Sequence, residues 1–134
     1  RRIKPDVAII TDVTHDTTTP MISKLKEGEC SCGSGPSLTY GPAVHNKLLD
    51  FIKATAEKNN IPVQYHAVSR STGTDTDAFA YSNGGCPSAL ISIPLRYMHT
   101  TVEMLHKQDI ENTIKLIYET LLKLTPKTNL SYFS

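Results

Sequence analysis

The sequence has almost no net charge and no long apolar run, and both absences exclude classes of partner. Its 14 lysines and arginines nearly balance its 13 aspartates and glutamates, which leaves a formal charge of +1. The chain therefore has no electrostatic footprint for nucleic acid and no basic helix of the kind that binds membrane surfaces. No apolar run approaches the roughly 18 residues that a membrane span needs. The expected partner is a small molecule or another protein.

Cysteine is also scarce, with only Cys30, Cys32 and Cys86. An odd count without disulfide-framework spacing favours a reducing compartment, and we expect a cytoplasmic protein. Cys30 and Cys32 have no second cysteine pair or nearby histidine, so they make a poor zinc site and a structural role is expected. Cys86 is expected to be a small buried apolar residue.

The length of the chain is that of one domain. A chain of 134 residues buries roughly two-thirds of its unfolded surface, which is enough for one core. We therefore expect a single domain over residues 1–134. An apolar segment suited to a strand lies only a few residues after Arg1, which indicates a piece of a longer protein.

Apolar patterns predict the strands. Continuous apolar runs over residues 6–13 and 88–95 indicate two strands, the first of them central in the sheet and covered on both faces. An alternating run predicts a third strand over 63–68. The sequence between Gly28 and Pro42 is rich in glycine and proline, and it leaves room for short strands near an edge of the sheet, at 29–32 and 37–39.

Apolar residues at helical spacing predict helices over residues 43–60 and 107–124, with a short capped helix over 77–82 between them. The apolar stripe of the last helix is expected to face the core, and it consists of Ile110, Ile114, Ile117, Leu121 and Leu124. Strands that alternate with helices imply an α/β sandwich with a largely parallel sheet.

Polar clusters follow three of the predicted strands, at residues 12–16, 73–77 and 96–99. In an open α/β sheet, ligands bind outside the carboxyl ends of the strands. Divalent zinc takes carboxylate oxygen and neutral imidazole nitrogen, so Asp12 and His99 are candidate ligands from two strand ends. The alternative is structural, because a strand-end aspartate commonly caps a turn and a lone histidine is commonly a hydrogen-bonded structural residue.

The segment "GTDTDA" at residues 73–78 is the start of the predicted short helix. It lacks the glycine density and the lysine of a phosphate-binding loop, so a capped helix start is the expected reading.

Four segments together resemble the C-terminal part of the catalytic domain of metallopeptidase family 42. They are "DVTHDTTTP", "GSGPSLTYGP", "GTDTDAFAYSNGGCPSALISIPLRYMHTTVEML" and "QDIENTIKLI", in the family's order over most of the chain. The family includes glutamyl and deblocking aminopeptidases and tetrahedral aminopeptidases, and its members are often labelled endoglucanases. The resemblance implies a three-layer α/β sandwich with a mostly parallel central sheet, here incomplete.

The resemblance also implies a site with two divalent metal ions, zinc or cobalt, that hydrolyses the N-terminal residues of peptides. Carried over position by position, Asp12 binds one metal and His99 binds the other. The family's further metal ligands and its Glu-Glu pair, which holds the general base, are absent from this sequence. Those segments lie upstream in the family, as does an inserted dimerisation domain, so truncation is the simplest explanation.

The resemblance therefore predicts that this chain by itself contains no catalytic residue, binds metal weakly or not at all, and is inactive. For the intact enzyme, the resemblance implies that a metal-bound water attacks the scissile carbonyl while a glutamate acts as general base. Supporting positions around the cleft are expected at His15, Gly73, Thr74, Asp75 and Arg96.

Two other functions remain open from the sequence. An endoglucanase-type glycoside hydrolase needs two facing carboxyl groups in a cleft usually lined with aromatic rings, and this chain has no tryptophan. A non-catalytic module could use the cleft or an open sheet edge to bind a partner. Because a truncated sheet leaves an edge or apolar surface uncovered, we also expect a homo-oligomer.

Overall fold

The computed structural model describes residues 3–82 and 84–133. Its strands are β1 (Ala8–His15), β2 (Ser37–Tyr40), β3 (Gln64–Ala67), β4 (Ser88–Arg96) and β5 (Met104–Leu105). Its helices are α1 (Lys24–Glu27), α2 (Asn46–Lys58), α3 (Asp75–Ala80) and α4 (Lys107–Lys123). Within the described residues, no helix is both long and apolar enough to cross a membrane.

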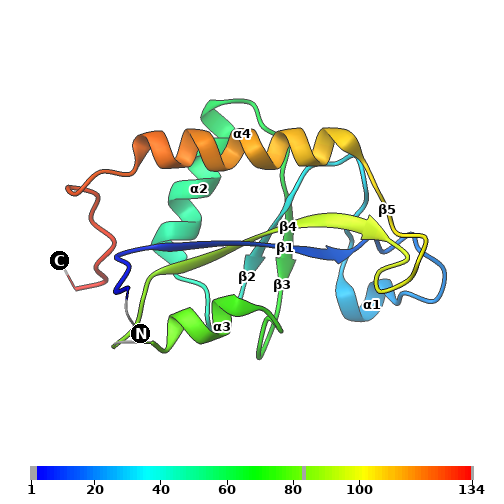
Figure 1. Ribbon diagram of the computed structural model, residues 1–134, viewed down its shortest axis with the longest axis horizontal. Coiled ribbons are helices and arrows are strands. Elements are labelled where there is room, and N and C mark those ends of the chain that lie inside the picture. The colour runs from blue at the N-terminus through cyan, green and yellow to red at the C-terminus, as the bar shows by residue number, and fades with distance from the viewer. Residues whose placement is uncertain (1–2, 83, 134) are drawn as a thin grey trace.

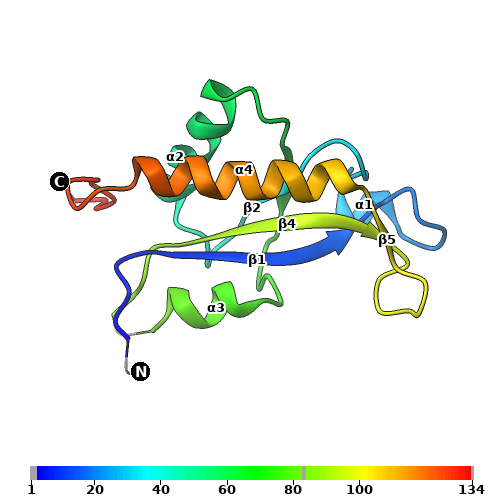
Figure 2. The ribbon, with the colours of Figure 1, turned by 45° about the horizontal axis from the view of Figure 1, so that its top comes forward.

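The five strands form one mixed sheet with the order β1-β4-β2-β3, and β5 pairs with the end of β4. The longer pairings, β1 with β4 and β2 with β3, are parallel. The short pairings of β4 with β2 and with β5 are antiparallel. Helices α2 and α4 cover one face of the sheet and α3 lies against the other (Figures 1 and 2). The predicted three-layer α/β sandwich with a mostly parallel sheet is confirmed.

The core lies between the sheet and the two long helices. Leu48, Leu49 and Ile52 of α2 recur at helical spacing and are fully buried. They pack with Leu38 of β2 and Ile91 of β4, which point to the same face of the sheet. Burying side chains of this size stabilises the fold by about 1.5–3 kcal/mol each. This apolar layer packs against one face of the sheet and supports the strands that carry the polar pocket residues on the other face.

Strand β1 differs from its prediction in two ways. It lies at an end of the sheet, paired with β4 only, rather than in the centre. It also continues through the polar residues to His15, so that Thr11, Asp12 and Val13 are exposed residues inside a strand and not a loop after one. The parallel register with β4, which pairs Asp12 with Ser92, extends the strand beyond its apolar part.

The short strands also differ from prediction. Residues 29–32 form no strand. The side chains of Thr17 and Asp16 hold this segment, together with one backbone hydrogen bond of 2.8 Å from the N–H of Thr17 to Cys30 O. The backbone N–H of Cys30 donates to Thr17 Oγ1 over 3.0 Å, and the N–H of Cys32 donates to Asp16 Oδ2 over 2.9 Å. Strand β2 does form, but it lies inside the sheet between β4 and β3 and not at an edge.

Helix α4 ends one residue before the end of the predicted range 107–124, and its buried face differs from the prediction. The residues that it buries are Asp109, Thr113, Leu116 and Thr120. Of the apolar stripe predicted to be core, Ile114 is 63% exposed and Leu121 is 57% exposed. The prediction was wrong for these two residues, although Ile117 of the same stripe does pack against the core. Asp109 fixes the rotation of the helix, because both of its carboxylate oxygens accept backbone N–H groups, from Gly33 and Gly35. Ile114 and Leu121 therefore face away from the described core.

Candidate functional site

A polar pocket of about 380 Å³ opens on the α3 side of the sheet. Five of the residues expected at the site lie in its lining, although they come from three separate parts of the chain. They are Asp12, His15, Gly73, Thr74 and His99. The fold therefore brings the segment 12–15 of β1, the loop before α3 and the loop after β4 to one place.

Asp12 is exposed and lies in the middle of β1. Its Oδ1 accepts a hydrogen bond of 2.8 Å from the backbone N–H of Val13. This local bond orients the carboxylate, and Oδ2 has no hydrogen bond to the described chain. Its neighbour in the parallel register is Ser92 of β4, which lines the same pocket.

His99 lies in the loop after β4, and the backbone of this loop is strained. Tyr97 and His99 have φ angles of 58° and 62°, in the left-handed region that non-glycine residues seldom adopt. The Glu103 carboxylate accepts a 2.6 Å hydrogen bond from the backbone N–H of His99, and Tyr97 O accepts one from Thr100 Oγ1. Strain of this kind costs about 1–3 kcal/mol per residue and concentrates at functional sites. The loop presents the His99 imidazole to solvent.

Arg96 and Asp75, expected as supporting residues, do not line the pocket. The Arg96 guanidinium lies 5.2 Å from the centre of the Tyr97 ring, so it packs beside the strained loop and not inside the site. Asp75 is the exposed first residue of α3.

The loop before α3 is shaped by Asp77, which the sequence analysis did not single out as a site residue. Its carboxylate accepts hydrogen bonds of 3.0 Å from the backbone N–H groups of Thr72 and Gly73. Thr74 caps α3 by accepting from the N–H of Thr76. The expected helix start is therefore a closed turn, and it presents Thr72, Gly73 and Thr74 to the pocket.

The residues after His15 form a structural turn. Asp16 is buried, and its carboxylate accepts from the backbone and hydroxyl of Thr18 and from the backbone of Cys32. Burial alone raises the pKa of Asp16, but these hydrogen bonds outweigh it and lower the pKa to about 2. Asp16 therefore stays ionised and anchors the loop beside β1.

The cysteines are unsuited to metal binding in this state. Burial, with a smaller effect of the Asp16 charge, raises the pKa of Cys30 to about 11. Burial and the hydrogen bond with Asp16 raise the pKa of Cys32 to about 12. Because the thiolate is the metal-binding form, both thiols are held in the wrong state, and Cys32 Sγ donates instead to Pro94 O.

Two charged or titratable residues of the lining were not foreseen, namely Glu27 and His66. His66 of β3 is in register with Thr39 of β2, which places both on the pocket face. The alternation of "VQYHAV" shows which residues share a face of the strand with His66, but only the strand order brings that face beside Asp12. Glu27 arrives through the four-residue helix α1, for which the sequence carries no clear signal.

The described lining is acidic and rich in histidine. It contains the carboxylates Asp12 and Glu27 and the imidazoles His15, His66 and His99, without a lysine or an arginine. Such a lining favours a cation over an anion. Within residues 3–82 and 84–133, however, no group of three or more histidine, cysteine, aspartate or glutamate side chains is arranged to hold a metal ion.

Comparison with solved structures finds the same fold. The chain superposes on the TET aminopeptidase from the marine sediment archaeon Thaumarchaeota archaeon SCGC AB-539-E09 with a TM-score of 0.81 and 32% identity, over 91% of this chain and 34% of that one. Two further similar structures, 34% and 30% identical, are described as a putative peptidase/endoglucanase and as a dodecamer of PhTET1-12s.

Sequence comparison identifies the family. The chain is 37% identical over 124 residues to the lysyl aminopeptidase of Pyrococcus furiosus, covering 92% of this chain and 35% of that protein. It thus spans about a third of the length of the relatives that it matches. The family model described as M42 glutamyl aminopeptidase matches residues 1–116. The chain therefore belongs to the M42 glutamyl aminopeptidase family.

Proposed function

We propose that this chain supplies part of the active site of a metal-dependent aminopeptidase, which removes N-terminal residues from peptides. One observation carries the proposal: Asp12 on β1 and His99 after β4, the two positions that match family metal ligands, line the same pocket. The family match of residues 1–116 includes both positions. The two residues are 87 positions apart in the sequence, and the pairing of β1 with β4 brings them together.

The donors in this pocket suit divalent zinc or cobalt in kind, but they are too few to hold two ions. Asp12 and His99 offer one carboxylate and one imidazole, whereas a catalytic zinc usually has three protein ligands. The described part of the chain has no complete metal-binding group. The proposal therefore assigns the remaining ligands and the general-base glutamate to the part of the catalytic domain that lies outside these residues.

In the complete site, the metal ions would supply an acidified water and polarise the scissile carbonyl. This chain would contribute orientation. The Val13 N–H holds the Asp12 carboxylate, and Glu103 holds the backbone of His99. The turn fixed by Asp77 would present the Gly73 backbone to a peptide bound in the cleft.

The chain by itself is predicted to be inactive and to bind metal weakly. Calorimetric titration with zinc is expected to show no tight binding of two ions, and amino-acid p-nitroanilides are expected to remain intact. Tight binding of two ions, or turnover by the purified 134-residue chain, would contradict the assignment of the missing ligands and base to other segments.

A glycoside hydrolase fits the pocket less well, although one similar structure is described as a putative peptidase/endoglucanase. No tyrosine or phenylalanine of the described chain lines the pocket, and carbohydrate clefts usually use such rings as platforms. The complete protein is therefore expected to hydrolyse amino-acid p-nitroanilides and to leave carboxymethyl-cellulose intact. The reverse result would favour the glycosidase.

We also propose that the complete protein is a cytoplasmic homo-oligomer. The described cysteines are free, as expected in a reducing compartment. The description of the similar PhTET1-12s structure as a dodecamer supports assembly from identical subunits. Light scattering on the complete protein is expected to give a multiple of the subunit mass, and a monomer mass would contradict the assembly.

A further inference from the structure

Residues 125–133, which we call the strap, turn back from the end of α4 and lie against the start of α2. Two hydrogen bonds close the turn: the Thr128 N–H donates to Thr125 O over 2.9 Å, and the Thr125 N–H donates to Thr128 Oγ1 over 3.0 Å. Beyond the turn, the half-buried Leu130 packs against the hydrophobic core. Figure 1 shows the strap in red, leaving the end of α4 and doubling back. The strap therefore has a definite docking position although it contains no helix or strand.

Ser131 and Tyr132 hold the strap at the first residues of α2. The Tyr132 ring stacks on the His45 imidazole, with 4.3 Å between the ring centres and 27° between the planes. The Tyr132 hydroxyl accepts a 2.8 Å hydrogen bond from the backbone N–H of Asn46. The Lys47 ammonium donates to Ser131 O and lies 5.9 Å from the centre of the Tyr132 ring. Because the first N–H groups of a helix have no partner inside it, the strap completes the start of α2.

His45, the ring that stacks on Tyr132, also caps α2. Its Nδ1 accepts a long hydrogen bond of 3.4 Å from the backbone N–H of Leu48. Only an unprotonated ring nitrogen can accept, and a protonated imidazole would also place a positive charge at the N-terminal end of the helix, where the helix dipole is already positive. Burial, and then the charge of Lys47, lower the pKa of His45 from its ordinary value of 6.5. The docked strap therefore favours neutral His45.

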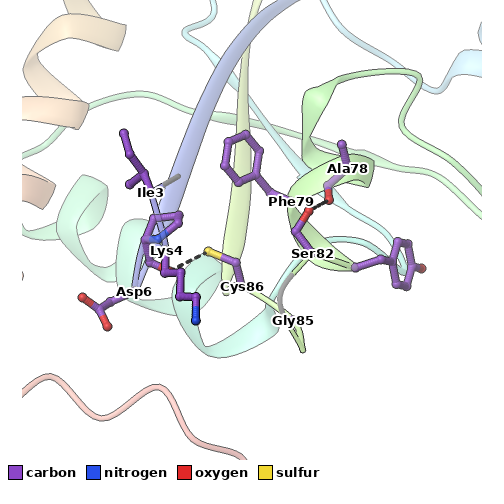
Figure 3. Close-up of a pocket in the computed structure, with 10 residues that line it drawn as sticks. Ile3, Lys4, Asp6, Ala78, Phe79, Ser82, Gly85 and Cys86 are labelled. Atoms are coloured by element: carbon purple, nitrogen blue, oxygen red, sulfur yellow. Dashed lines mark hydrogen bonds between the residues drawn. The ribbon is translucent and has the colours of Figure 1, made fainter. Parts of the chain in front are cut away.

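An opening of about 610 Å³ beside His45 contains no acidic side chain in its described lining, which consists of residues 42–45, 84–87 and 130–132 and Ala80. The other titratable side chains of this lining are Tyr132 and Cys86, and both are uncharged in the pH range in which a histidine titrates. The Cys86 thiol also points elsewhere: Figure 3 shows it directed to the neighbouring opening, where Sγ donates to Pro5 O over 3.4 Å. Lys47 is therefore the charged group that faces His45.

We infer that the strap is a pH-sensitive device, which docks on α2 while His45 is neutral and is released when His45 becomes protonated. Release frees the Asn46 N–H, withdraws Leu130 from the core and widens the opening beside His45. None of the residues of this contact lines the pocket at Asp12 and His99, so the inference does not rest on the proposed function.

Release leaves the sheet and the helices in place. The backbone N–H of His45 donates to Ser88 O of β4 over 2.8 Å, and Ser88 Oγ donates to Ala43 O over 3.0 Å, so the start of α2 is held to β4 without the strap. The strap itself buries little, since Tyr132 is 53% exposed and Phe133 is fully exposed. A segment with so few buried contacts opens at a free energy far below that of global unfolding, so the loss of one aromatic contact and one cap is enough to release it.

An NMR titration of the purified chain from pH 8 to pH 4.5 tests the inference. It follows the His45 Cε1–H, the Tyr132 ring protons and the Leu130 methyl groups. Docking is fully stable above pH 6.5 and weakens as the pH falls below it, because the undocked imidazole binds the proton more tightly than the docked one. The Tyr132 and Leu130 signals are expected to move to random-coil positions together with His45, at one midpoint below pH 6.5. Docked signals at pH 4.5 after His45 has titrated, or random-coil signals already at pH 8, would overturn the inference.

Two variants separate this device from a merely structural contact. His45→Asn keeps a side-chain acceptor at the helix start but cannot titrate, so the pH response of Leu130 and Tyr132 is expected to disappear. Tyr132→Ala removes the stack, and the midpoint of the His45 titration is expected to rise towards pH 6.5.

His106→Asn is the matched control, because His106 caps α4 in the same way, with its Nδ1 accepting from the Gln108 N–H over 3.2 Å, and lies at the other end of α4 from the strap. This variant is expected to keep the pH response of the strap. A response that survives His45→Asn, an unmoved His45 midpoint in Tyr132→Ala, or a response lost in His106→Asn would contradict the inference.

Discussion

At the scale of single residues, hydrogen-bonding partners separate site residues from structural ones. Asp12 and Asp16 are four positions apart in one polar run. Asp12 lines the pocket, whereas Asp16 is buried and its carboxylate accepts three hydrogen bonds. The strand-end rule and the family motif both selected Asp12 and His99 from the sequence. Neither could select His66 or Glu27, because their place in the pocket depends on strand order and on the short helix α1.

Asp16→Asn tests the structural role of this carboxylate through the pH dependence of stability. The folded pKa of about 2 lies below the ordinary value of 3.8, so ionised Asp16 stabilises the fold above pH 3.8, and this stabilisation is lost as the pH falls towards 2. Its size is about 2 kcal/mol. The difference in unfolding free energy between the wild type and Asp16→Asn, from urea denaturation, is expected to shrink between pH 5 and pH 2. A difference independent of pH would contradict this role.

At the scale of elements, the sequence predicts where a helix or strand lies better than what covers it. The apolar patterns placed one helix over residues 43–60 and one strand over 88–95, close to the observed bounds of α2 and β4. The same reasoning placed β1 in the centre of the sheet, which was wrong. It also placed the apolar stripe of α4 in the core, which was wrong for Ile114 and Leu121 and right for Ile117. A pattern shows which residues share a face, but which layer covers that face depends on the rest of the fold.

The loop between Cys32 and β2 shows how a glycine fixes two elements relative to each other. Gly35 has a φ of 94°, and a Cβ atom there would lie 2.0 Å from the carbonyl oxygen of Pro62. Gly35 also donates to Asp109 of α4 over 2.9 Å. Gly35→Ala is therefore expected to cost at least about 3 kcal/mol, since it adds a clash to the strain of a left-handed residue.

Gly28→Ala is the control for this loop, because Gly28 has a φ of 78° but open space around its Cβ position. It should cost about 1–3 kcal/mol, the cost of a backbone conformation with φ of 78° and ψ of −163° that is nearly confined to glycine. Urea denaturation of both variants measures the difference, and equal costs would show that the close approach to Pro62 is relieved easily.

At the scale of the whole molecule, the described residues gather polar groups from distant parts of the chain around one pocket. The sheet, α2 and α4 hold Asp12, His99 and the Gly73 turn around it, and the outer edge of β1, the strand that carries Asp12, has no paired strand in the described chain. The proposed function assigns the metal donors that this pocket lacks to residues outside the described ones.

The most direct test of this account uses a chimera in which this chain replaces the matched 124-residue segment of the Pyrococcus furiosus lysyl aminopeptidase. The measured quantity is the zinc content of the chimera after dialysis against zinc. The account predicts that the chimera binds two zinc ions, that Asp12→Ala and His99→Ala each reduce the bound zinc, and that Asp75→Ala, outside the pocket, does not. Unchanged zinc content in both the Asp12→Ala and the His99→Ala chimeras would contradict the assignment of these two residues as metal ligands.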